Sequence, residues 1–195
     1  MDRDRLTAFT DGVLAVIIAI MVLEMKAPHG ATLHDLVEIL PVFVSYVLSF
    51  IYVGIYWNNH HHFFHLVGAV NGAILWANMH LLFWLSMVPF ATAWMGENHF
   101  APVPTALYGL SLLMPAIAWY IMQTVIMRQQ GDHSALRHAL GRDIKGKISP
   151  VLYLAGAGLA FVNTWIAGLL YFAVALMWLI PDRRVEKSVT HTPAT

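Results

Sequence analysis

The segment that decides the fold is RLTAFTDGVLAVIIAIMVL, residues 5–23, in which an arginine and an aspartate precede an unbroken apolar run. Together with the turn before it, this run reaches the roughly 20 residues that an α-helix needs to cross the hydrocarbon core of a bilayer. Ionisable groups are costly in or next to lipid, and in membrane helices they usually have a function. Arg5 and Asp11 are therefore candidate functional residues at the entrance of a membrane-spanning helix.

The whole chain has the composition of an integral membrane protein. Of its 195 residues, 58% are hydrophobic and 11% are charged, whereas a soluble domain carries roughly 25% charged residues. The mean hydropathy is +0.63. The formal net charge is zero, so no nucleic-acid partner is expected. The chain has no cysteine, which excludes disulfides and thiolate metal sites.

Six segments are apolar enough to be predicted as membrane-spanning helices, so we expect an all-α integral membrane protein with a single six-helix domain over residues 1–195. The last two segments are short for a full span and need local thinning of the bilayer or burial behind other helices. The His-rich stretch 58–65 and residues 95–104 are expected to be connections. The predicted helices are residues 6–25, 33 or 37–57, 66–94, 105–127, 149–162 and 165–180.

Basic residues predict the orientation of these helices. Arg3 and Arg5 precede the first helix, five basic residues lie in 128–147, and three follow the last helix. With six spans nearly all of them fall on one side, which must be cytoplasmic, whereas five spans would place the last three outside. We therefore expect both termini in the cytoplasm, a cytoplasmic connection over residues 128–147 and a frayed cytoplasmic tail over residues 182–195.

Four apolar residues of the first helix share one face. Because helical residues advance by about 100° each, Val16, Ala19, Ile20 and Leu23 fall within about 100° of arc. None of them can coordinate an ion through its side chain. If they line a pore, its constriction is hydrophobic and gates by dewetting. The alternative is that this stripe packs against other helices or faces lipid, and the pattern alone leaves both open.

The two charged residues of the first helix are predicted to anchor it. Arg5 and Asp11 are about 120° apart around the helix, so each is expected to bind groups on neighbouring helices rather than the other. The candidate partners are Trp57, His60 and His61. The alternative is an interfacial arginine with a capping aspartate.

Residues 60–65 contain four histidines. His61 and His65 are four residues apart, a spacing that places both on one helix face and suits a metal ion. No carboxylate or cysteine is near them in the sequence, and His80 is the only other histidine candidate within the membrane. We therefore expect no metal site, no cofactor and no enzymatic activity. A pH-sensing role for these histidines stays open.

The opening motif resembles the signature of the transmembrane protein 175 family of endosomal and lysosomal potassium channels, in its bacterial branch. That signature is Arg-x-x-x-Phe-Ser-Asp at the start of the first helix. Arg5, Phe9, Thr10 and Asp11 match it, with threonine in place of serine. Residues 12–13, 22–24, 56–61 and 85–93 are similar to later segments of the family, in the same order.

The resemblance implies a homotetrameric channel for monovalent cations, with K⁺ as the permeant ion, in the lipids of the plasma membrane. The first helices would surround the central axis, with the constriction at Val16 and the next turns lined by Ala19, Ile20 and Leu23. Two positions depart from the family pattern: Val16 is shorter than the usual Ile or Leu, and Ala19 replaces a usual Thr. Loss of that hydroxyl removes one oxygen per subunit, so modest selectivity for K⁺ over Na⁺ is expected.

Two other functions are alternatives to a channel. The chain lacks a Thr-Val-Gly-Tyr-Gly segment, so a carbonyl-cage filter is absent and any selectivity needs another origin. A small membrane transporter would need a broken helix and polar groups that converge at mid-membrane, and the apolar middle of the first helix disfavours it. A metal-dependent membrane enzyme that uses the His cluster would contain bound metal.

Overall fold

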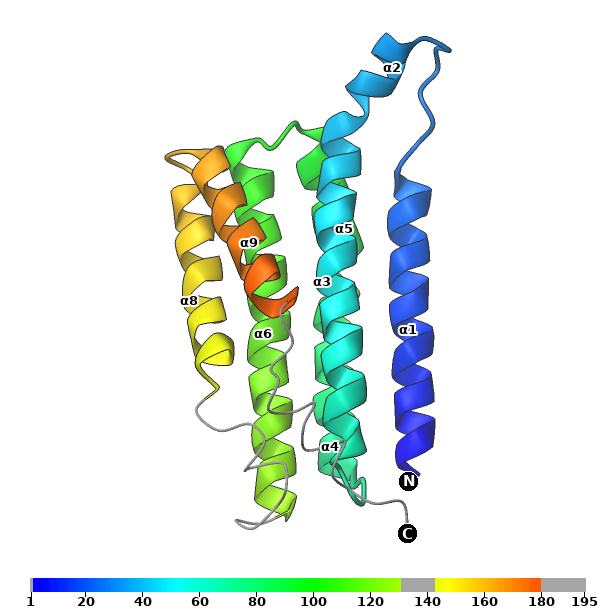
Figure 1. The fold of residues 1–195 in the computed structure, drawn as a ribbon, viewed down its shortest axis with the longest axis vertical. Coiled ribbons are helices and arrows are strands. Elements are labelled where there is room, and N and C mark those ends of the chain that lie inside the picture. Colours follow the sequence, from blue (N-terminus) through cyan, green and yellow to red (C-terminus); the bar gives the residue numbers. More distant parts are fainter. Residues whose placement is uncertain (1, 131–142, 180–195) are drawn as a thin grey trace.

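The apolar run near the N-terminus forms a single long helix at one edge of the molecule (Figure 1). The computed structural model describes residues 2–130 and 143–179, and every regular element in this part of the chain is helical. In chain order the helices are α1 (Arg3–Glu24), α2 (Leu33–Glu38), α3 (Leu40–His65), α4 (Gly72–Leu85), α5 (Val88–Glu97), α6 (Pro102–Gln130), α8 (Ile144–Leu159) and α9 (Thr164–Leu179). α1 packs against α3, α4 and α5, and α6 packs against α4, α5, α8 and α9.

Four helical segments of the described chain are long and apolar enough to cross a membrane: α1, α3, the pair α4–α5, and α6. α8 and α9 have 16 residues each, which corresponds to about 24 Å at 1.5 Å per residue. This is shorter than a hydrocarbon core of about 30 Å. The described part of this membrane protein is thus all-helical with four candidate spans, and the count of six stays a prediction.

The short helix α2 precedes α3 and stands beyond the end of the bundle (Figure 1). It begins with a capping box, in which the backbone N–H of Thr32 donates to Asp35 Oδ2 at 2.8 Å and the backbone N–H of Asp35 donates to Thr32 Oγ1 at 3.3 Å. The hydrogen bonds from the side chain and backbone of Thr32 hold the pKa of the Asp35 carboxyl below its usual value.

The next helix, α3, is longer than the sequence predicted. It continues to His65, so the prediction that residues 58–65 form a connection is wrong. The histidines and asparagines of this stretch are polar, which favoured a connection over a helix. The stretch also contains Phe63 and Phe64, whose side chains are only 5% and 1% exposed and pack into the bundle. A helix that extends past the hydrocarbon needs only one apolar face.

The predicted third helix is divided into α4 and α5 at Ser86 and Met87. Pro89 lies in the first turn of α5. It has no backbone N–H to donate, and its ring would clash with the carbonyl of Leu85 if the helix continued. One proline therefore ends α4 and starts α5.

The connections between helices are shorter than predicted. The predicted loop 95–104 shrinks to residues 98–101, because α5 and α6 extend into it. α6 and α8 likewise extend into the predicted cytoplasmic connection 128–147 from both sides. The remainder of that connection, residues 131–142, and the predicted tail 182–195 lie outside the described residues.

The prediction of two helices separated at Asn163 and Thr164 is confirmed. Asn163 Oδ1 accepts a hydrogen bond from the backbone N–H of Trp165 at 2.9 Å. An asparagine at this position caps a helix start, because its side chain satisfies an N–H that has no partner within the helix. The polar interruption seen in the sequence is thus the turn between α8 and α9.

Tyr171 joins α9 to α6 and α8. Its side chain is 1% exposed, and its hydroxyl donates to the backbone carbonyl of Thr105 at 3.2 Å. The ring lies directly against two glycines, Gly109 of α6 and Gly156 of α8, where a Cβ atom would overlap it. Both glycines are required for this close approach of three helices.

Substitution of Gly156 tests this contact. Gly156→Ala should destabilise the protein by about 1–3 kcal/mol, because the added methyl group overlaps the Tyr171 ring. Gly158→Ala is the matched control on the same helix, since a Cβ there meets no atom within 4 Å. It should be neutral or stabilising by up to about 1 kcal/mol. Thermal unfolding of both variants in detergent measures the difference, and equal midpoints would contradict the close packing.

Candidate functional site

α1 buries one face and leaves the opposite face uncovered. The buried residues, each at most 3% exposed, are Leu6, Thr10, Leu14, Ile17 and Met21. The predicted constriction residues lie on the uncovered face, with Val16 56%, Ile20 41% and Leu23 79% exposed. Ala19 lies in the same stripe and is also exposed. In a membrane, this face must contact lipid or another copy of the chain.

A chain of buried hydrogen bonds joins α1 to α4 and α3. Asn78 Nδ2 donates to Thr10 Oγ1 at 2.9 Å, and Asn78 Oδ1 lies 2.9 Å from His60 Nε2. All three residues are at most 2% exposed. Because an amide oxygen only accepts, His60 donates through Nε2–H. These three helices are therefore held together by fully buried polar groups, each of which would be costly to leave unpaired.

Aromatic side chains fix the ring of His60. The ring of Phe64 stacks on it with centroids 4.3 Å apart, and the ring of Trp119 from α6 lies 6.5 Å away. Phe64 is one turn further along α3, so the helix itself supplies the stacking partner. The imidazole is consequently oriented toward Asn78.

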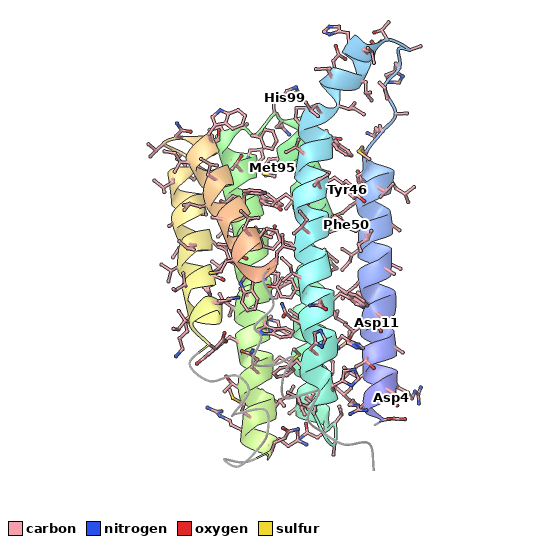
Figure 2. All side chains as sticks on the ribbon, in the orientation of Figure 1. Asp4, Asp11, Tyr46, Phe50, Met95 and His99 are labelled. Atoms are coloured by element: carbon pink, nitrogen blue, oxygen red, sulfur yellow. The ribbon has the colours of Figure 1, made fainter. Side chains whose placement is uncertain are left out.

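A second, more exposed contact joins α1 to α3. Trp57 Nε1 donates to Asp11 Oδ1 at 3.1 Å, and Figure 2 shows Asp11 between the two helices. Trp57 stacks on His61, with ring centroids 6.2 Å apart, and the Nε2 atoms of His61 and His65 are 3.0 Å apart. The structure thus brings together Asp11, Trp57 and His61 on one side, and Thr10 and His60 on the buried side.

Two members of the opening motif take no part in these contacts. Arg5 and Phe9 lie on the uncovered side of α1, and Phe9 is 51% exposed. In residues 2–130 and 143–179, no hydrogen bond or ion pair joins Arg5 to Trp57, His60 or His61. The role predicted for Arg5 in this network therefore stays a prediction.

Asn78 is a member of the network that was not predicted from the sequence. Its signal in the sequence is an amide within the apolar run that follows Asn71 and Gly72. An amide within the membrane needs a hydrogen-bond partner, so such a residue is a candidate member of a polar network. The partners of Asn78 could not be predicted from the sequence, because Thr10 and His60 are 68 and 18 residues away from it.

The histidines of α3 do not form a metal cluster with the surrounding side chains. Among the described residues, no group of three or more His, Cys, Asp or Glu side chains could hold a metal ion. His61 and His65 instead contact each other edge to face, with ring centroids 4.4 Å apart. His80 is on α4, where its Nε2 accepts a hydrogen bond from Trp84 Nε1 at 2.9 Å.

A further buried cluster holds α3 against α5 and α6. Ser49 Oγ lies 2.7 Å from Thr92 Oγ1 and 2.9 Å from the Tyr108 hydroxyl. Thr92 also donates to the backbone carbonyl of Val88 at 2.7 Å. These hydroxyl groups satisfy one another, so they add rigidity to the interior of the bundle and offer no open coordination position.

Fold and site together define an α-helical membrane protein whose first helix is fixed by internal polar contacts and exposes an apolar stripe. The family described as endosomal/lysosomal potassium channel TMEM175 matches residues 5–89. A relative from Chryseobacterium sp., named a potassium channel, is 54% identical over 189 residues, which cover 97% of this chain and 98% of the relative. The chain therefore belongs to the TMEM175 family, which is a family of potassium channels and not of enzymes.

Two further comparisons agree with this assignment. A protein named potassium channel from Streptomyces collinus is 32% identical over 176 residues, covering 83% of this chain and 84% of that protein. The crystal structure of a lysosomal potassium-selective channel TMEM175 homolog from Chamaesiphon minutus superimposes with a TM-score of 0.82 at 27% identity, covering 92% of this chain and 97% of that one. The resemblance found in the opening motif is thus confirmed.

The buried hydrogen-bond chain can be tested at Thr10. Thr10→Val keeps the shape of the side chain but leaves the Asn78 N–H without an acceptor, so we expect a loss of about 1–3 kcal/mol in stability. Thr10→Ser retains the hydroxyl and should lose less, about 0.8 kcal/mol for one buried methyl group. Thr124→Val is the control, because its hydroxyl bonds only the Tyr120 carbonyl of its own helix. Thermal unfolding in detergent provides the comparison, and equal losses for Thr10→Val and Thr124→Val would exclude a structural role for the network.

Proposed function

We propose that the chain forms a homotetrameric cation channel that prefers K⁺, with four copies of α1 around a central pore. The observation that carries this proposal is the uncovered apolar stripe of α1 that contains Val16 and Leu23, 56% and 79% exposed. The ring of four Val16 side chains is the constriction. It acts as both gate and filter, because a narrow apolar passage holds back water and admits only ions that shed part of their hydration.

The internal contacts of α1 support this assignment over a lipid-facing stripe. An apolar helix in lipid gains little from one rotation over another, because lipid tails are as apolar as its side chains. α1 nevertheless has its rotation fixed by two contacts, Thr10 with Asn78 and Asp11 with Trp57. A pore-lining helix requires such a fixed rotation, whereas a helix that only contacts lipid does not.

The outer end of α1 carries negative charge that suits cations. Glu24 at the end of α1 and Glu97 at the end of α5 line the same groove, which has a volume of about 350 Å³. Carboxylates near a pore entrance raise the local concentration of cations. Modest selectivity for K⁺ over Na⁺ then depends on the cost of dehydration at the apolar ring, since Ala19 offers no side-chain oxygen.

The membrane topology follows the distribution of basic residues. We propose that α8 and α9 are the fifth and sixth spans, shortened and packed behind α6, with both termini in the cytoplasm and the protein in the plasma membrane. Their contacts with α6 and with each other allow two short helices to complete the bundle. Local thinning of the bilayer accommodates their length.

A polar substitution at the constriction tests the pore assignment. Val16→Asn should wet the passage and raise K⁺ flux into liposomes by roughly tenfold, a barrier reduction of about 1.4 kcal/mol. Val22→Asn introduces the same side chain at another exposed position of α1, about 120° around the helix from Val16. This control should leave the flux near that of the wild type. If the two variants conduct alike, the permeation path does not pass Val16.

The selectivity argument predicts a gain of function at Ala19. Ala19→Thr adds one hydroxyl per subunit beside the passage, and a net hydrogen-bond contribution of about 0.5–1.5 kcal/mol corresponds to about a two- to tenfold increase in the K⁺/Na⁺ permeability ratio. Ala15→Thr is the control, because Ala15 is exposed on α1 but lies outside the stripe. Reversal potentials in mixed K⁺/Na⁺ solutions give the ratio. A wild-type channel already strongly selective for K⁺ would contradict the role given to Ala19.

A further inference from the structure

Two exposed histidines lie side by side at the C-terminal end of α3. His61 and His65 are four residues apart, so their side chains are neighbours on the same helix face. Their Nε2 atoms are 3.0 Å apart, and the rings meet edge to face with centroids 4.4 Å apart. Both residues are exposed. The pair is therefore separate from the buried hydrogen bonds that connect Thr10, Asn78 and His60.

The distance between these two nitrogen atoms suits a shared metal ion. An imidazole nitrogen binds Zn²⁺ at about 2.0–2.1 Å, so two such nitrogens are about 2.9 Å apart at a right angle and about 3.3 Å apart at the tetrahedral angle. The 3.0 Å between His61 Nε2 and His65 Nε2 lies between these values. A small rotation of the two rings turns both lone pairs to one point. Because the helix already holds the rings together, binding an ion orders little that is not ordered before.

The pair lies at an end of the bundle where a hydrated ion can reach it. α3 ends at His65, and Arg3 Nη1 in the first turn of α1 lies 3.5 Å from the carbonyl oxygen of Val67, just beyond that end. Arginine side chains near helix ends reach to the membrane–water interface. An ion therefore does not have to enter the hydrocarbon to contact the two rings.

We infer that His61 and His65 form a two-point site for a divalent transition-metal ion such as Zn²⁺ or Ni²⁺, with water in the other coordination positions. Imidazole suits these ions, whereas Mg²⁺ and Ca²⁺ prefer oxygen ligands. No group of three or more His, Cys, Asp or Glu side chains could hold a metal ion within the described residues, so the two imidazoles are its protein ligands. Such a site needs neither the carboxylate nor the cysteine whose absence in the sequence argued against metal.

Binding moves one proton and releases none. In the contact between the two neutral rings, the Nε2–H of one histidine donates to the Nε2 of the other. In the complex both Nε2 atoms bind the metal, so the donating ring carries its proton on Nδ1 instead. Both imidazoles stay neutral, and the end of α3 gains the full charge of the ion.

The site is connected to the contact between α1 and α3. The ring of His61 stacks on that of Trp57, with centroids 6.2 Å apart, and Trp57 Nε1 donates to Asp11 Oδ1 at 3.1 Å. A metal ion that fixes the His61 ring also restricts the indole that Asp11 binds. The role that this geometry supports is regulatory: an exchangeable ion stabilises the position of α1 against α3.

Calorimetric titration of the purified full chain with Ni²⁺, after removal of any affinity tag, tests the site. His65→Gln removes one of the two ligands and should weaken the affinity by at least about tenfold, because even loss of a group that only orients a metal ligand costs 10–100-fold. His62→Gln is the matched control: it removes a histidine from the same segment, and no third side chain joins the pair. Its affinity should equal that of the wild type. Equal affinities of His65→Gln and the wild type would overturn the inference.

Thermal unfolding distinguishes a shared ion from ions bound to single histidines. The midpoint of the wild-type protein should rise with Ni²⁺, because two rings one turn apart bind an ion together only while the helix is folded. His61→Gln and His65→Gln should each lose this rise, and Mg²⁺ should not produce it. If either variant responds to Ni²⁺ as the wild type does, the rings do not share an ion and the inference fails. Neither measurement involves ion flux, so the metal site and the pore are tested separately.

Discussion

The position of α1 depends on a buried chain of hydrogen bonds from Thr10 through Asn78 to His60. In water, an amphipathic helix is oriented by burial of its apolar face, but in a bilayer both faces of α1 contact equally apolar surroundings and this preference is weak. Directional bonds between buried polar groups then decide the rotation. A rotation of α1 that kept its apolar contacts would leave the Asn78 amide unpaired in a medium that offers no water.

The fixed rotation gives α1 two sides with different surroundings. The buried side carries Thr10, and the uncovered side carries the apolar stripe of Val16 and Leu23. The charged residues of α1 are confined to its first nine residues, from Arg3 to Asp11, and to its last residue, Glu24. If α1 lines the pore as proposed, this arrangement suits a passage in which charges gather ions at the mouths and an apolar middle sets the barrier. A charge at mid-height would bind an ion and slow its exit.

Much of this arrangement could be predicted from the sequence, and the failures have physical causes. Composition and the apolar run near the N-terminus were sufficient for the membrane class and for α1, and the polar pair at Asn163 predicted the turn between α8 and α9. The extension of α3 over residues 58–65 was missed because a helix outside the hydrocarbon is not continuously apolar. Trp57 was among the candidate partners of Asp11, but Asn78 was not a candidate, because a hydrogen bond between distant segments leaves no local periodicity.

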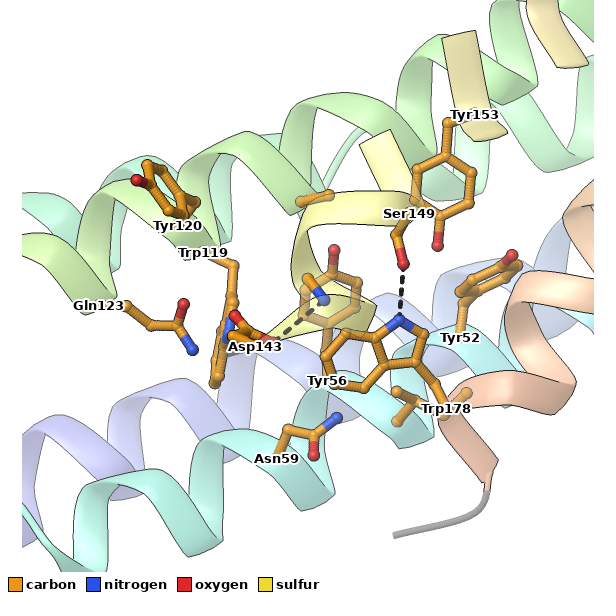
Figure 3. Close-up of a pocket in the computed structure, with 13 residues that line it drawn as sticks. Tyr52, Tyr56, Asn59, Trp119, Tyr120, Gln123, Asp143, Ser149, Tyr153 and Trp178 are labelled. Atoms are coloured by element: carbon orange, nitrogen blue, oxygen red, sulfur yellow. Dashed lines mark hydrogen bonds between the residues drawn. The ribbon is translucent and has the colours of Figure 1, made fainter. Parts of the chain in front are cut away.

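The C-terminal half of α3, near His60, is shared by two polar regions of the bundle. His60 faces Asn78 and the α1 network, whereas Tyr56 and Asn59, within one turn of it, line a cavity between α3, α6, α8 and α9 (Figure 3). Trp119 contacts both, with its ring 6.5 Å from His60 and 6.2 Å from Tyr56. Since these rings are closely packed, a displacement of α3 that enlarges or collapses the cavity also moves His60. The packing around the cavity and the rotation of α1 are therefore constrained by the same two turns of α3.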